Sequence, residues 1–257
     1  MDLGIAGRTA LITGASKGIG YAAAESLARE GCNVHLAART EADLASARDR
    51  IRGRFNVGVE IHAVDLSDGD AARGLIETCR DVDILVNNAG AIPGGDLQSV
   101  GEETWREAWD LKVFGYQNTC RAAYRNMKAR GKGVIINVIG AAGERPIAGY
   151  IAGSAGNASL MAFTRALGGG STIDGIRVVG INPGQIETER LVTMLRTTAE
   201  RDLGDPERWR EVASQDYPAG QPEHIGDMVA FLASDLSANT TGTIITIDGG
   251  ASHRTRF

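Results

Sequence analysis

The fold of this chain is decided at Thr13-Gly14-Ala15-Ser16-Lys17-Gly18-Ile19-Gly20. The apolar run Thr9–Ile12 before it has the composition of a short buried strand, and the alanine-rich segment Tyr21–Glu30 after it has that of a helix. Glycines let a backbone turn tightly and approach a ligand, while the new helix points free N–H groups at an anion. The order strand, glycine turn, helix therefore predicts a nucleotide phosphate site, although the spacing alone also fits an ordinary turn.

The overall composition is that of a globular protein without the charge pattern of a nucleic-acid binder. The chain has 257 residues, 43% apolar and 23% charged, with a formal net charge of -5. No apolar stretch approaches the ~20 residues of a membrane span, and the N-terminus does not resemble a signal peptide. Cys32, Cys79 and Cys120 are widely spaced, without a metal-ligand pattern. We therefore expect free thiols, no metal site, no nucleic-acid or membrane partner, and a cytoplasmic protein.

Strand-like apolar runs alternate with helix-like segments along the whole chain. Most of the runs are continuous and β-branched, as in parallel strands that are buried on both faces. The seven runs are Thr9–Ile12, Asn33–Ala37, Val59–Val64, Ile84–Asn87, Val134–Val138, Arg177–Ile181 and Thr243–Ile247. Segments such as Glu41–Arg52 and Asp70–Cys79 have room for crossover helices. The pattern predicts a single domain over 1–257, a Rossmann-type doubly wound α/β sheet of about seven parallel strands with helices on both faces.

The end of the second run favours NADP(H) over NAD(H). Sites that prefer NAD usually place an acidic residue about 20 positions after the glycines, where it binds the ribose hydroxyls. Here small Ala38 occupies that region and Arg39 follows it. A guanidinium binds a 2′-phosphate by paired hydrogen bonds, and Lys17 adds a second positive charge. The alternative is that both are solvated surface cations.

Two further strand ends carry candidate cofactor residues. Asp65 and Leu66 follow the third run, where a carboxylate can accept a hydrogen bond from the adenine amino group. The sequence Asn87-Asn88-Ala89-Gly90 ends the fourth run, and its small residues suit close packing against a flat ring. Taken alone, this tetrapeptide also fits a simple turn.

Together these segments resemble the short-chain dehydrogenase/reductase family from about Ala6 to Gly250. The segment Asn182–Thr188 resembles the family loop that holds the nicotinamide carboxamide, and Thr241–Gly250 resembles its final strand. The resemblance implies hydride transfer between nicotinamide and a carbonyl or alcohol carbon of a small-molecule substrate, in a homotetramer or homodimer. The implied cofactor residues are Gly14, Ser16, Lys17, Gly18, Ile19, Gly20, Arg39, Asp65, Leu66, Asn88, Ala89, Gly90, Tyr150, Pro183, Gly184, Ile186 and Thr188.

The catalytic region departs from the family pattern of Ser, Tyr-x-x-x-Lys and Asn. Tyr150 matches the tyrosine, but Ser154 stands four residues on, where the lysine belongs. Gly140 falls at the serine position and Lys112 at the asparagine position. A free tyrosine has a pKa of about 10 and is a poor base near neutral pH unless a nearby cation favours the phenolate. Loss of that support weakens acid–base catalysis worth ~10²–10⁴-fold.

Three residues are candidate substitutes. We hypothesise that Lys112 brings its ammonium toward the space left at Ser154, the alternative being a solvated helix lysine. Ser154 is a candidate for binding the ribose hydroxyls in place of the family lysine. Asn157 lies seven residues after Tyr150 on the same helix face, where it either donates to substrate or caps internal polar groups.

A polar, helix-prone segment at about 189–221 is expected to form a lid over the substrate. Its apolar residues Met194, Leu195 and Trp209 either line a hydrophobic pocket or pack the lid onto the body. Arg145 and Arg190 either meet an anionic substrate or are solvated.

The sequence thus predicts an NADP(H)-dependent oxidoreductase in which Tyr150 donates the proton in reduction, supported by Lys112, Ser154 and Asn157. The absent Ser and Lys leave a second possibility, a redox-inactive nucleotide-binding sensor or scaffold subunit on the same fold. A lyase or isomerase is a third, since fold alone does not fix the reaction.

Overall fold

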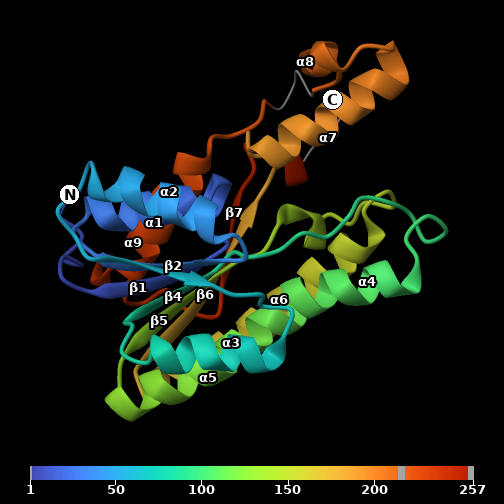
Figure 1. The fold of residues 1–257 in the computed structure, drawn as a ribbon. Coiled ribbons are helices and arrows are strands. Elements are labelled where there is room, and N and C mark those ends of the chain that lie inside the picture. Colours follow the sequence, from blue (N-terminus) through green and yellow to red (C-terminus); the bar gives the residue numbers. More distant parts are fainter. Residues whose placement is uncertain (1, 214–217, 254–257) are drawn as a thin grey trace.

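A parallel sheet of seven strands crosses the molecule in the order β3-β2-β1-β4-β5-β6-β7 (Figure 1). The computed structural model describes residues 2–213 and 218–253. The strands are β1 Thr9–Thr13, β2 Asn33–Ala38, β3 Val59–Ala63, β4 Ile84–Asn87, β5 Gly133–Val138, β6 Ile176–Pro183 and β7 Ile244–Ile247. The strand order reverses between β1 and β4, and ligands bind at the carboxyl ends of the strands at such a point. The predicted fold class is confirmed.

Helices cover both faces of the sheet (Figure 1). They are α1 Gly18–Arg29, α2 Glu41–Arg52, α3 Gly69–Thr78, α4 Glu102–Trp109, α5 Gly115–Arg130, α6 Ile151–Gly170, α7 Glu189–Leu203, α8 Trp209–Val212 and α9 Pro222–Ala233. A π-helical turn, Asp110–Phe114, joins α4 to α5. None of the helices in residues 2–213 and 218–253 is long and apolar enough to cross a membrane.

Two hydrophobic cores lie on the two faces of the sheet, because alternate side chains of each strand point to opposite faces. Ile12 and Ile136 pack on the face that α1, α2 and α9 cover. Leu11 and Ile135 pack on the face of α3 and α5. Each such fully buried side chain contributes about 1.5–3 kcal/mol. Burial on both faces explains why the strands read as continuous apolar runs, which made them predictable.

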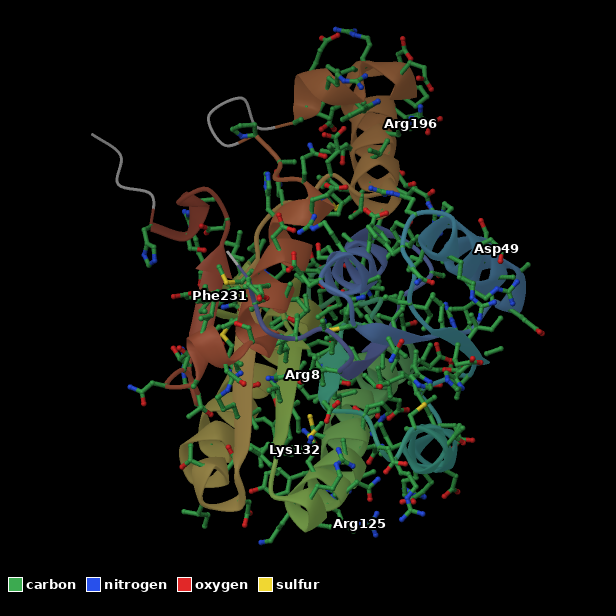
Figure 2. All side chains as sticks on the ribbon, turned by 90° about the vertical axis from the view of Figure 1, so that its left-hand side faces the viewer. Arg8, Asp49, Arg125, Lys132, Arg196 and Phe231 are labelled. Carbon is green, nitrogen blue, oxygen red and sulfur yellow. The ribbon has the colours of Figure 1, made fainter. Side chains whose placement is uncertain are left out.

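Apart from β4, whose bounds are as predicted, the strands differ from the predicted ones by one or two residues at an end. The third run was expected to reach Val64, but β3 ends at Ala63. β6 is longer than expected and extends to Pro183, which brings the following loop to the carboxyl edge of the sheet. From that loop α7 projects beyond the sheet (Figure 1). Arg196 on α7 and Arg125 on α5 consequently lie at opposite ends of the molecule (Figure 2).

Candidate active site

One cavity of about 1370 Å³ lies at the carboxyl ends of the strands. This volume exceeds the ~300–1,000 Å³ of common small-molecule pockets, so the cavity has room for a dinucleotide together with a substrate. Most of the predicted site residues line it, namely Gly14, Ser16, Lys17, Gly18, Ile19, Asn88, Ala89, Gly90, Lys112, Tyr150, Asn157, Pro183, Gly184, Ile186 and Thr188. The fold therefore brings together segments that are far apart in the sequence.

The glycine turn lines the cavity, so the N-terminus of α1 faces into it. Lys17 precedes the helix without a side-chain cap, and the first turn contains no acidic residue. The first N–H groups of α1 are therefore available to an anion. Gly18 has a φ of +57°, and a Cβ built on Gly20 would lie 2.1 Å from the Gly14 carbonyl oxygen. Because these two positions need glycine, the turn has the geometry that a phosphate site requires.

Asn88 ties this turn to the neighbouring strand. Its backbone N–H donates to Thr13 Oγ1 at 2.9 Å, and its side-chain amide donates to the Thr13 carbonyl at 3.1 Å. The Ala89 N–H also donates to Thr13 Oγ1, at 3.0 Å. These hydrogen bonds hold the loop after β4 against the glycine turn. This agrees with the expectation that Asn88 supports a cofactor site there.

Four predicted cofactor residues do not line the cavity. Gly20 instead allows α1 to pack on the turn, and Leu66 is buried in the core beneath α3. Asp65 accepts hydrogen bonds from Ser67, which lower the pKa of its carboxyl group, and the charge of Arg39 lowers it further. Arg39 and Asp65 are therefore neighbours on the exposed surface, outside the lining of the cavity.

Sequence reasoning missed the part of the cavity that α1 and α2 provide. Tyr21, Asp43, Ser46 and Arg50 line this part. The Arg50 guanidinium lies 3.9 Å from the centre of the Tyr21 ring and donates to the Ser16 carbonyl at 3.5 Å. Spacing along α2 carries no signal for this contact, because it depends on how α2 packs beside α1.

Tyr150 lies just before α6 rather than on it. Its segment is fixed by the Gly95 N–H, which donates to the Gly149 carbonyl at 2.7 Å, and by the Ile151 N–H, which donates to the Gly95 carbonyl at 3.2 Å. A Cβ built on Gly153 would lie 2.0 Å from Cζ of Tyr150. The Tyr150 ring therefore fills the space that a side chain at position 153 would have, one helical turn into α6.

The other two α6 candidates have different surroundings. Ser154 Oγ accepts from the Ile147 N–H at 3.0 Å, so this residue anchors the preceding loop and does not line the cavity. The predicted ribose contact of Ser154 has no support in this arrangement. Asn157 does line the cavity, and its Nδ2 lies 2.7 Å from where a Cβ on Gly140 would be. The Asn157 amide thus occupies the space beside the position that resembles the family serine.

Lys112 projects from the π-helical turn into the cavity wall. Its Nζ donates to the Tyr116 hydroxyl and to the Val138 carbonyl, each at 2.9 Å. The Tyr116 hydroxyl also donates to the Val138 carbonyl, at 2.7 Å. Burial lowers the pKa of Lys112 to about 7, with a further lowering from the charge of Arg190. A solvated lysine, the alternative considered above, is excluded because this side chain is buried.

The cation beside Tyr150 is Arg190, not Lys112 as hypothesised. Burial raises the pKa of Tyr150, and the charge of Arg190 together with its hydrogen bond to the phenol opposes that rise. Arg190 also donates to the carbonyls of Gly90, at 3.3 Å, and Ile92. It comes from the first turn of α7, and no sequence spacing relates it to Tyr150. The described contacts of the Lys112 amine go to Tyr116 and Val138 instead.

The segment expected to form a lid has its own small hydrophobic cluster. Leu195 and Trp209 pack together within it, whereas Met194 lines the cavity. Of the two alternatives, lining the pocket holds for Met194, whereas Leu195 and Trp209 pack within the segment itself rather than onto the body. The lid is joined to the glycine turn by the Lys17–Glu189 ion pair at 3.0 Å. Residues 214–217 of the predicted lid lie outside the described residues.

Comparison with known proteins identifies the family. The profile of the short chain dehydrogenase family matches residues 8–199. The chain belongs to this family. This short-chain dehydrogenase is 32% identical to the L-xylulose reductase of Mesocricetus auratus over 254 residues, which cover 97% of this chain and 98% of the relative. The resemblance inferred from the sequence motifs is confirmed.

Solved structures of other family members superpose closely on this one. The L-sorbose reductase from Gluconobacter frateurii, complexed with NADPH and L-sorbose, matches with a TM-score of 0.93 at 30% identity and covers 99% of this chain and 100% of that one. An NAD+-bound xylitol dehydrogenase matches with a TM-score of 0.87 at 25% identity, over 96% of this chain and 100% of that one. These relatives are oxidoreductases with nicotinamide cofactors, of both the phosphorylated and the unphosphorylated kind.

Proposed function

We propose that this chain is an NADP(H)-dependent oxidoreductase that interconverts a carbonyl and an alcohol, with Tyr150 as the proton donor in reduction. The observation that carries the proposal is the position of the Tyr150 ring, which fills the space beside Gly153 and faces the cavity. Pro183, Gly184 and Thr188 line the same cavity, so they are in place to hold the nicotinamide end. When bound, the cofactor supplies or accepts the hydride.

The surrounding residues suit Tyr150 to donating a proton. Because burial raises its pKa, the phenol keeps its proton through neutral pH. The Arg190 guanidinium stabilises the phenolate left after the proton has gone. The Asn157 amide, beside Gly140, is placed to donate a hydrogen bond to a substrate oxygen, which is the orienting task of a serine hydroxyl.

Lys112 contributes a positive charge to the same wall of the cavity. With a pKa of about 7, its amine is partly protonated at neutral pH. An ammonium there favours negative charge developing on a substrate oxygen, an effect that is strong in a site from which water is excluded. Lys112 thus makes the electrostatic potential in the cavity more positive, while Arg190 favours the phenolate form of Tyr150.

Replacement of Tyr150 tests the reaction. Tyr150→Phe keeps the ring but removes the proton, so kcat for reduction should fall by ~10²–10⁴-fold while the Kd for NADPH stays the same. Tyr124→Phe is the matched control, since the Tyr124 hydroxyl donates to Asp174 at 2.6 Å and does not line the cavity. L-xylulose and L-sorbose are suitable first substrates because relatives of the chain act on such sugars.

Three results of this experiment separate the alternatives. Loss of turnover only in Tyr150→Phe supports the proposal. Equal turnover in Tyr150→Phe and the unmodified chain removes Tyr150 from the mechanism. NADPH binding without turnover of any carbonyl substrate by the unmodified chain favours the sensor or scaffold function.

Two guanidinium groups support the preference for NADP(H). Arg39 is exposed, and Arg50 on α2 lines the cavity. Arg39→Ala should weaken NADPH binding by ~10–100-fold, the loss expected for a hydrogen bond to a charged group, and leave NADH binding unchanged. Arg48→Ala is the control, since Arg48 pairs with Asp49 and does not line the cavity. Equal loss for both cofactors would contradict the assignment.

We further propose that the enzyme is a cytoplasmic homodimer or homotetramer. Two exposed aromatic side chains offer apolar surface for association, Phe114 before α5 and Phe231 on α9. Figure 2 shows Phe231. Light scattering on the eluting peak of a size-exclusion column measures the mass, and a mass of 27.1 kDa, that of one chain, would contradict an oligomer.

A further inference from the structure

Three potential metal ligands meet at the edge of the sheet, outside the cavity. His35 belongs to β2, His62 to the edge strand β3, and Cys79 follows the last residue of α3. Nδ1 of His35 lies 2.9 Å from Nε2 of His62. Sγ of Cys79 lies 3.6 Å from the first of these nitrogens and 3.5 Å from the second. The three ligand atoms therefore form a compact triangle.

The register of the sheet creates this cluster. β2 and β3 pair so that His35 lies opposite Glu60, and Ala37 opposite His62. Residues two apart on a strand share a face, so both imidazoles point to the side that α3 covers. Cys79, at the end of α3, is 3% exposed and closes the cluster from that side. The sequence analysis predicted no metal site because the three ligands come from three separate elements.

Two of the three separations agree with those in a tetrahedral zinc centre, and the third is shorter. Zn–S bonds of ~2.3 Å and Zn–N bonds of ~2.0–2.1 Å at tetrahedral angles place sulfur about 3.6 Å from each nitrogen. Both sulfur–nitrogen distances in the cluster match this value. The nitrogen–nitrogen distance of 2.9 Å corresponds to an angle of about 90° at the metal, with the same bond lengths.

Glu60 is a charged neighbour of the cluster, but it is not one of the three residues whose ligand atoms meet. Glu60 shares the strand face of His62 and pairs with His35 across the ladder. Its carboxylate acts electrostatically on both imidazoles. Because β3 is the edge strand, water also reaches this side of the cluster.

We propose that His35, His62 and Cys79 bind one Zn²⁺ ion, with a water molecule as the fourth ligand. Two imidazoles and one thiolate form a donor set that zinc favours. Zinc at this position cross-links β2, the edge strand β3 and the end of α3, and so stabilises the edge of the sheet. Hydrogen bonds among two neutral imidazoles and a thiol are the alternative arrangement at these distances, and metal binding distinguishes the two.

Titration with Co²⁺ tests the site directly, because Co²⁺ replaces Zn²⁺ and its thiolate complexes absorb in the near ultraviolet. The full chain, freed of metal with a chelator, should bind one Co²⁺ with a thiolate-to-cobalt band, and added Zn²⁺ should abolish that band. His62→Gln and Cys79→Ala should weaken binding by more than the ~10–100-fold that loss of an outer-shell partner costs. His253→Gln, an exposed histidine outside the cluster, should bind as the unmodified chain does.

Thermal unfolding provides a second readout that does not depend on the spectrum. Zn²⁺ should raise the unfolding midpoint of the unmodified chain and of His253→Gln, but not that of His62→Gln, since only a folded site binds the ion. Absence of the thiolate band in the unmodified chain would overturn the proposal. So would equal Co²⁺ affinity in His62→Gln, which would indicate adventitious binding elsewhere.

Discussion

Replacing Lys112 by methionine isolates the free-energy cost of a buried amine. Lys112 is 8% exposed, and its Nζ has only a phenol and a carbonyl as described hydrogen-bond partners. Methionine fills a similar volume, and the Val138 carbonyl keeps its hydrogen bond from Tyr116. The variant therefore removes the charge without leaving a buried acceptor unpaired.

The magnitude follows from the pKa. A fall from 10.5 to about 7 corresponds to about 5 kcal/mol at ~1.4 kcal/mol per pH unit. Above pH 7 the folded chain releases the Lys112 proton, while the unfolded chain holds it up to about pH 10.5. Because the unfolded state binds more protons in this window, stability rises with pH there. Between pH 7 and 9 the unmodified chain should gain ~2–3 kcal/mol relative to Lys112→Met.

Guanidinium unfolding of both proteins at several pH values from 6 to 9 measures this difference. Lys132→Met is the control, because Lys132 is largely exposed and forms a surface ion pair with Asp83. Its stability should run parallel to that of the unmodified chain. Parallel curves for Lys112→Met as well would refute the assignment of a depressed pKa to the buried amine.

Two further substitutions test the site. Gly153→Ala places a Cβ where the Tyr150 ring lies and should lower kcat by ~10²-fold or more, whereas Gly169→Ala, on the same helix with no atom within 4 Å, should leave kcat unchanged. Steady-state kinetics with NADPH checks both, and normal turnover in Gly153→Ala would show that the ring position is unimportant. Glu189→Gln breaks an exposed ion pair with Lys17 and should cost less than ~1 kcal/mol of stability by thermal unfolding. A larger loss of stability would contradict the description of Lys17–Glu189 as an ordinary exposed ion pair.

The fold was predictable because its signals are local. Runs such as Ile84–Asn87 are continuous and apolar, since helices bury both faces of the sheet, and the predicted bounds of that strand are the observed ones. The glycine turn was also predictable, because strand, glycines and helix are consecutive in the sequence. Its geometry depends on backbone conformations that few other residues adopt.

The catalytic surroundings were less predictable because they depend on contacts between elements. Spacing placed Tyr150 on α6, whereas the chain turns into the helix only at Ile151. The approach of Arg190 to Tyr150 depends on where α7 starts after β6, and no periodicity reports that. A cue for Lys112 was present in its i, i+4 spacing to Tyr116, which places both side chains on one helix face.

The position of α7 leads us to expect a fixed order in which ligands enter and leave. Thr188 and Glu189, at its start, lie against the glycine turn, while Met194 lines the cavity one turn further along. One helix thus covers both the expected phosphate site and the expected substrate site. If α7 closes over the substrate, we expect the cofactor to bind before the substrate and to leave after the product. Ordered kinetics follow, with the oxidised cofactor a competitive inhibitor against NADPH, and competition against the carbonyl substrate instead would exclude this order.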